Sequence, residues 1–94
     1  MKKGQNVFED LGFSFEEAEN LRIRADLMLE LRKFIEKKKL TQKEAAQFFG
    51  ETQPRISNLL NGHIERFSVD KLIAMLHKAG VRVHVATEVV KKAA

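Results

Sequence analysis

The segment 40–62, with the sequence LTQKEAAQFFGETQPRISNLLNG, constrains the fold more than any other part of the chain. It contains two short apolar-periodic runs separated by only two residues, of which the first is Gly50. Thr41 precedes the first run and is followed three residues later by a glutamate, which is the spacing of a capping box. A glycine directly after an apolar run suits the positive φ of a helix C-terminus. The segment therefore predicts two short helices, 40–49 and 52–61, which cross closely at two small alanines.

Two further helices are predicted on either side of this pair. The first, over 15–38, begins at Ser14, whose spacing to Glu17 is again that of a capping box, and it carries a wide apolar face. The other, over 68–79, is preceded by Phe67 with the spacing of a hydrophobic staple, and a glycine follows it. The chain is thus expected to be mainly helical.

After Gly80 the periodicity changes from that of a helix to that of a strand. Apolar β-branched residues alternate with other residues over 81–87, which predicts a short C-terminal strand. A single strand cannot satisfy its own backbone groups, so it needs a partner, either the segment around 6–10 or the same strand of a second subunit. We favour the second option, because antiparallel self-pairing about a two-fold axis closes a homodimer. The expected dimerisation residues are Val81, Val83 and Val85.

Length and composition bound the class of protein. The 94 residues fit one small domain, so residues 1–94 are expected to form a single unit. The absence of cysteine excludes a disulfide framework, a thiolate metal site and a cysteine nucleophile, and it favours a cytoplasmic location. No run reaches the ~18 apolar residues of a membrane span, and the first residues lack the apolar region of a secretory signal. We therefore expect no contact with a membrane.

The charge is unevenly distributed along the chain. The net charge is +4, yet residues 1–20 hold two lysines against five acidic residues, so the remainder is basic. A basic body suits a polyanion such as DNA. The three histidines lack the spacing of metal ligands, and no glycine-rich phosphate loop is present. Neither catalysis nor a metal or other cofactor is expected.

The second of the two short helices has a polar face of a particular kind. Ile56, Leu59 and Leu60 take its inward positions. The outward positions carry hydrogen-bonding groups with almost no acid, which suits nucleic acid, and they are occupied by Gln53, Arg55, Ser57, Asn58 and Asn61.

The stretch resembles the helix-turn-helix of the Xre/Cro/lambda-repressor family in its LTQ, AA, turn glycine, TQPRIS and LLNG. NVFEDLGF, the long first helix, RFSVDKL and the terminal strand extend the likeness over nearly the whole chain. They are similar to small Xre-type regulators that act as antitoxins of HigBA-like toxin–antitoxin pairs, and to stand-alone repressors. The resemblance implies an all-α, four-to-five-helix lambda-repressor-like domain with a short C-terminal β-strand. Its parts would be an N-terminal segment, 1–14, a helix-turn-helix, 41–61, and the strand.

The resemblance also implies which residues touch DNA. In such domains the start of the second helix enters the major groove, where Arg, Gln and Asn side chains pair with base edges. The base-reading residues would be Thr52, Gln53, Arg55, Ser57 and Asn58. Phosphate would be held by Thr41, Gln42, Asn61, Arg66, Ser68 and Lys71. Pro54 departs from the pattern, because several repressors carry a second glutamine there and proline cannot read a base.

The function implied is that of a dimeric transcriptional repressor bound to a palindromic operator in double-stranded DNA, with a toxin protein as a partner if the chain is an antitoxin. The alternative is a protein-interaction module, in which the acidic N-terminal segment and the first helix hold a basic toxin and DNA binding is secondary. Loss of operator affinity on replacing Gln53 or Arg55 by alanine would separate the two hypotheses.

Overall fold

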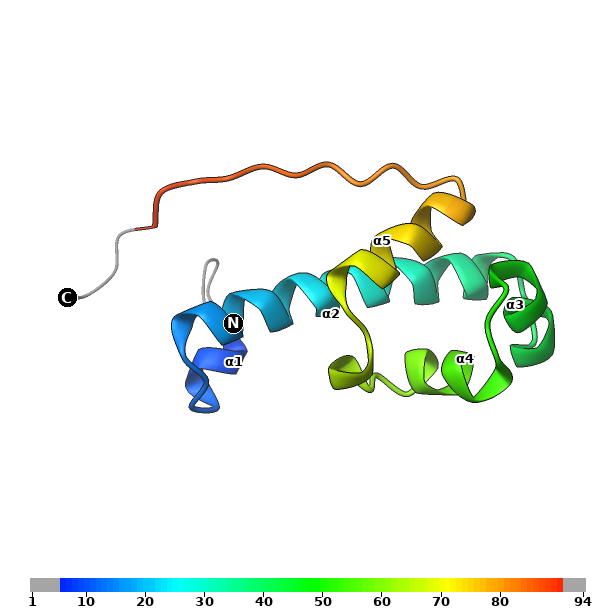
Figure 1. The fold of residues 1–94 in the computed structure, drawn as a ribbon, viewed down its shortest axis with the longest axis horizontal. Helices are drawn as coiled ribbons and strands as arrows, with labels where there is room; N and C mark the ends of the chain where they lie inside the picture. The colour runs from blue at the N-terminus through cyan, green and yellow to red at the C-terminus, as the bar shows by residue number, and fades with distance from the viewer. Residues whose placement is uncertain (1–5, 91–94) are drawn as a thin grey trace.

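The computed structural model describes residues 6–90, which form a set of helices gathered around one long helix (Figure 1). In chain order the elements are α1 (Val7–Asp10), α2 (Phe15–Lys37), α3 (Gln42–Phe49), α4 (Gln53–Leu60), the 3-10 helix η1 (Ile64–Arg66) and α5 (Val69–Lys78).

Helix α2 is the element that organises the others. In Figure 1, α5 crosses one side of it, α4 and η1 approach from the opposite side, and α1 folds back against its N-terminal end. Helix α3 packs against α4. Although α2 has 23 residues, no helix within residues 6–90 is both long and apolar enough to cross a membrane.

The four predicted helices are confirmed, with boundaries within two residues of those expected. Each begins at a side chain that accepts a hydrogen bond from a backbone N–H of the first turn. In the capping box of α3, Thr41 Oγ1 accepts from the Glu44 N–H at 3.1 Å, and the Thr41 N–H donates to Glu44 Oε1 at 2.8 Å. The hydrogen bonds with Thr41, of which the one from its backbone N–H has the larger effect, hold the pKa of the Glu44 carboxyl below its usual value. The four N-caps are Ser14, Thr41, Thr52 and Ser68.

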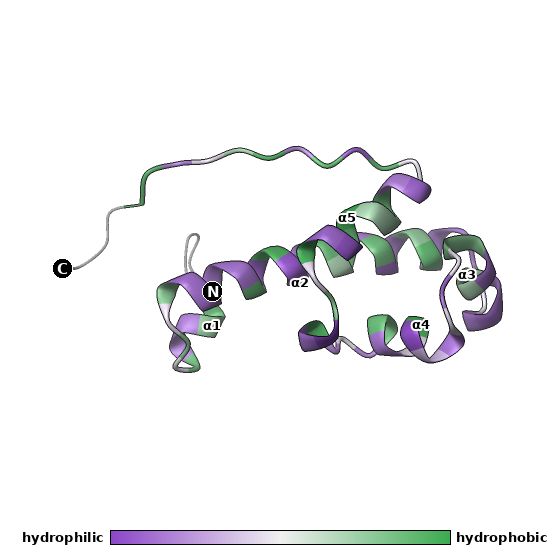
Figure 2. Cartoon of the chain, in the orientation of Figure 1, coloured by the Kyte–Doolittle hydropathy of each residue, from purple (hydrophilic) through white to green (hydrophobic). Residues whose placement is uncertain are grey.

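One hydrophobic core joins α2 to α3, α4 and α5. Figure 2 shows hydrophobic residues interspersed with hydrophilic ones along α2, α4 and α5, and those of α4 that are buried are Ile56 and Leu59. Ala45 and Ala46 are both buried, as the close crossing of α3 and α4 requires. The buried cluster comprises Met28, Leu31, Ile35, Ala45, Ala46, Phe49, Ile56, Leu59, Phe67, Leu72, Met75 and Leu76.

The predicted C-terminal β-strand is wrong for this chain on its own. Residues 81–90 run as an extended trace back along the molecule, and no residue from 6 to 90 is part of a strand (Figure 1). The physical reason is the lack of a partner, because 6–10, one of the two segments considered for pairing, forms the cap and body of α1. The alternation has another cause: Val81 and Val83 pack against the core, whereas Val85 is 82% exposed.

Candidate nucleic-acid interface

The turn between α3 and α4 is closed by two local features. Gly50 has a φ of 67°, the left-handed conformation that glycine adopts without strain. Lys78 Nζ, on α5, donates to the Phe49 carbonyl at 2.8 Å and so satisfies one of the free carbonyls at the end of α3. The end of α3, from which the turn leads to α4, is therefore bonded to α5.

The N-terminus of α4 presents polar groups to solvent. Thr52 Oγ1 caps the helix by accepting from the Arg55 N–H at 3.2 Å, and Pro54 stands in the first turn, where a missing N–H has no cost. Gln53 is exposed, and its side chain makes no hydrogen bond within residues 6–90. Asn58, half-buried on the next turn, is likewise free within that range. Two amide side chains are thus available at the end of α4 that was predicted to read bases.

Three of the predicted phosphate residues lie at helix starts. Thr41 and Ser68 cap α3 and α5, and Gln42 is the first residue of α3 and is exposed. Helix N-termini favour anions, because their N–H groups and the helix dipole point outward. Capping and phosphate contact are compatible at Thr41 and Ser68, since a hydroxyl that accepts one bond can still donate another.

Two others lie after α4. Asn61 is exposed and donates from Nδ2 to Ser57 Oγ at 3.2 Å, so the two side chains form one polar unit at the end of α4. Arg66, on η1, is exposed, with its Nε 3.8 Å from a Glu65 carboxylate oxygen. Helix α4 and η1 lie on the same side of α2, opposite the extended segment (Figure 1).

Arg55 and Lys71 are engaged by other groups of the same chain. Arg55 Nη1 donates to the Arg66 carbonyl at 3.0 Å, and its guanidinium carbon lies 5.0 Å from the centre of the Phe67 ring. Its Nε lies 3.7 Å from Glu51 Oε1, and the other oxygen of Glu51 is paired with Lys71 Nζ. The carboxylate of Glu51, whose side chain is only 12% exposed, thus joins two of the predicted DNA-binding cations.

Comparison with known proteins identifies this arrangement. A family model described as a helix-turn-helix domain matches residues 7–88. A solved structure of a protein assigned to the XRE family of transcriptional regulators is similar over 83% of this chain and 91% of that one, with 30% sequence identity and a TM-score of 0.74. The chain belongs to the XRE family of helix-turn-helix regulators. No curated protein matches the sequence.

Two residues of this XRE-family chain that bear on the interface were missed in the sequence. Glu51, in the turn between α3 and α4, pairs with Arg55, and its spacing of four from Arg55 is the sequence signal for this ion pair. Arg24, on α2, donates to the carbonyls of Ile64 and Phe67, each at 3.3 Å. No local pattern indicates the contacts of Arg24, because its partners lie 40 and 43 residues away. Within residues 6–90 there is no group of three or more His, Cys, Asp or Glu side chains placed to hold a metal.

Proposed function

We propose that this XRE-family regulator is a sequence-specific repressor whose single domain reads a palindromic operator as a homodimer. The observation that carries the proposal is the polar face of α4, where the side chains of Gln53, exposed in the first turn, and Asn58, half-buried one turn further on, have no hydrogen bond within residues 6–90, and where the first turn holds no acidic residue. Gln and Asn can each bridge two groups of adenine in the major groove. Thr52 and Ser57 complete the proposed base-reading set.

The proposed phosphate contacts surround α4. Thr41, Gln42 and Ser68 supply polar groups at helix starts, while Asn61 and Arg66 are exposed after α4. A phosphate could also compete with Glu51 for Lys71, since their ion pair is at the protein surface and exchange would add a cation to the interface. Such contacts set the register of α4 on the duplex, and base contacts give the specificity.

The extended segment supports the dimer part of the proposal. Apart from the Val81 N–H, which donates to the Leu76 carbonyl at 2.9 Å, its backbone groups have no partner within residues 6–90. An unpaired extended backbone with an exposed valine, Val85, is a template for pairing with a second chain. Val81 and Val83, which are already packed on the core, would fix the position of the segment relative to the helices and so the register of antiparallel pairing. A two-fold dimer would then meet half-sites about 34–36 Å apart.

Fluorescence anisotropy on duplex DNA from upstream of the gene tests the proposal, with a random duplex as the reference. We expect a preference for the upstream duplex, and a loss of affinity as salt rises, because phosphate contacts release counterions. Gln53→Ala should lose most of the preference, whereas Gln47→Ala, an exposed glutamine of α3, should keep it. Equal binding of both duplexes by the wild type would refute sequence-specific recognition.

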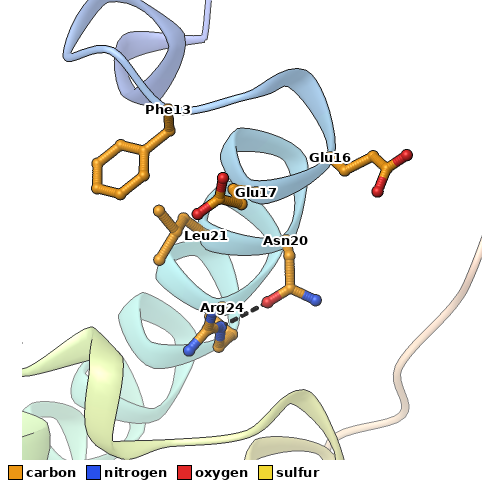
Figure 3. A pocket seen from close by; sticks show the side chains of 6 residues that line it. All are labelled: Phe13, Glu16, Glu17, Asn20, Leu21 and Arg24. Atoms are coloured by element: carbon orange, nitrogen blue, oxygen red, sulfur yellow. Dashed lines mark hydrogen bonds between the residues drawn. The ribbon is translucent and has the colours of Figure 1, made fainter.

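A second candidate function is capture of a basic partner protein, such as a toxin, at the corner between α1 and α2. There a shallow pocket of about 400 Å³ has apolar walls from Phe13 and Leu21 with Glu16 and Glu17 beside them (Figure 3). Leu11, in the turn before it, is 69% exposed. Exposed apolar groups flanked by carboxylates fit a basic, partly apolar surface.

Calorimetric titration with the product of the neighbouring gene tests this candidate. Phe13→Ser should weaken the complex, and Phe48→Ser, which removes a similarly exposed ring on α3, should not. A chain that binds such a partner but shows no preference for the upstream duplex would favour this function over repression.

A further inference from the structure

The loop between α4 and α5 is held by two arginines from two different helices. Arg24 of α2 donates to the carbonyls of Ile64 and Phe67, and Arg55 of α4 donates to the carbonyl of Arg66 between them. Three carbonyls within four consecutive residues therefore accept from guanidinium groups. The same loop carries the exposed side chain of Arg66 and leads into Ser68.

Two of the three guanidinium nitrogens of Arg55, Nη1 and Nε, have partners within the described chain, and an aromatic ring lies beside the group. Nη1 donates to the Arg66 carbonyl, Nε lies 3.7 Å from a carboxylate oxygen of Glu51, and the guanidinium carbon lies over the ring of Phe67, which is 2% exposed. A bidentate contact to guanine needs two N–H groups of one edge directed at the base. Each such edge of Arg55 includes Nη1 or Nε, so reading a guanine would compete with the hydrogen bond to Arg66 or with the ion pair to Glu51.

The anchorage of Arg24 is of the same kind. Its Nε donates to Asn20 Oδ1 at 2.7 Å, which orients the side chain along α2, and its Nη1 is thereby directed to the loop (Figure 3). Its backbone lies on α2, away from the polar face of α4, so a base-reading role does not compete as an explanation. Replacing Arg24 therefore tests whether the position of the loop affects DNA binding without changing any side chain of α4.

We propose that Arg55 is a positioning residue rather than a base reader, and that Arg24 and Arg55 together fix the α4–α5 loop relative to α4. This places Arg66 and Ser68 at a set distance from Gln53, so that phosphate and base contacts form in one register without reordering the loop. A pre-ordered loop lowers the entropy lost on binding. The structural half of this inference, that the two arginines fix the loop, rests on the contacts described above. Its functional half, that the fixed loop sets the register of the DNA contacts, rests on the proposed operator binding.

The decisive experiment compares Arg55→Ala with the wild type on a set of operators in which each base pair is replaced in turn. We expect affinity to fall by about tenfold on every operator, the scale set by loss of one charge-assisted hydrogen bond, with the pattern of base preference unchanged. Thermal unfolding should show a Tm lower by about 5 °C. Loss of preference at a single G·C pair, with an unchanged Tm, would overturn the proposal.

Arg24→Met provides the second arm, and Arg22→Met is its matched control. Both variants remove one positive charge from α2, but Arg22 pairs with Glu19 and Asp26 and does not touch the loop. We expect Arg24→Met to weaken all operators alike and Arg22→Met to leave their affinities within about twofold of the wild type. Equal effects of the two variants would contradict a role for the loop contacts.

Amide hydrogen exchange keeps the inference testable without DNA. In Arg55→Lys and Arg24→Met, the N–H of Phe67, which donates to the Ile64 carbonyl at 3.3 Å, should exchange faster, while amides in the middle of α2 should not. Unchanged exchange in the loop would refute the structural half. A wild type that prefers no duplex would instead refute the proposed function and leave this result intact.

Discussion

Replacing Thr52 by alanine removes the group that begins α4, and the cost follows from a count of the first-turn N–H groups. Pro54 has none, the Ile56 N–H donates to the Thr52 carbonyl at 3.1 Å, and the Arg55 N–H donates to Thr52 Oγ1 at 3.2 Å. Only Gln53 is left with an N–H that has no partner in this turn. With alanine at position 52, the N–H of Arg55 would also lack a partner.

Loss of a threonine N-cap costs about 1 kcal/mol, because the freed N–H must be satisfied by water with poorer geometry. For a chain of this length, that free energy lowers the Tm by about 4–8 °C. Thr52→Ser keeps the hydroxyl and should unfold within about 2 °C of the wild type. Thermal unfolding followed by circular dichroism measures both variants. If Thr52→Ala and Thr52→Ser unfold at the same temperature, the cap contributes nothing and the count is wrong.

Three further outcomes are expected. Leu59→Ala, in the fully buried side of α4, should lower the free energy of unfolding by about 2–5 kcal/mol in urea titration, and a smaller loss would mean that the core closes over the cavity. Gly50→Ala should cost about 1–2 kcal/mol because of its positive φ, and unchanged denaturant stability would contradict this. Hydrogen bonds from Arg22 and, to a smaller extent, from Asn6 lower the pKa of the Glu19 carboxyl below its ordinary value of 4.5. These bonds should therefore stabilise the folded chain fully above pH 4.5, and this contribution should be lost as the pH falls through the lowered pKa. In acid titration of stability, Glu19→Gln should lack this component.

The helices were predictable because their determinants are local. Ser14, Thr41, Thr52 and Ser68 each act on an N–H three residues ahead, so the start of a helix is encoded within one turn of sequence. Gly50 ends α3 in the same local way, by adopting a conformation that other residues adopt at a cost. The two small alanines of α3, Ala45 and Ala46, are buried as the sequence predicts for a helix that packs closely on its neighbour.

The contacts of Arg55 were not predictable from the same reasoning. Helical periodicity puts its Cα on the outward side of α4, which favoured a base-reading role. The side chain is long enough to fold back, and where it goes depends on the Arg66 carbonyl and the Phe67 ring, 11 and 12 residues further along. Periodicity reports the direction of a Cα–Cβ bond, and it carries no information about the end of a flexible side chain.

The prediction of a strand at 81–87 was wrong for the single chain, and the reason bears on how this regulator assembles. Alternation reports that one side of an extended chain is buried, and Val81 and Val83 are indeed packed on the core, but it does not report whether a second backbone is present. In a homodimer, the same residues would acquire that backbone without leaving the core. Helix α4 lies on the opposite side of α2 from this segment (Figure 1), so pairing there would leave the proposed DNA-binding side open. Strand formation and operator binding should therefore both increase with protein concentration, because one dimerisation step supplies the second strand and the second recognition helix.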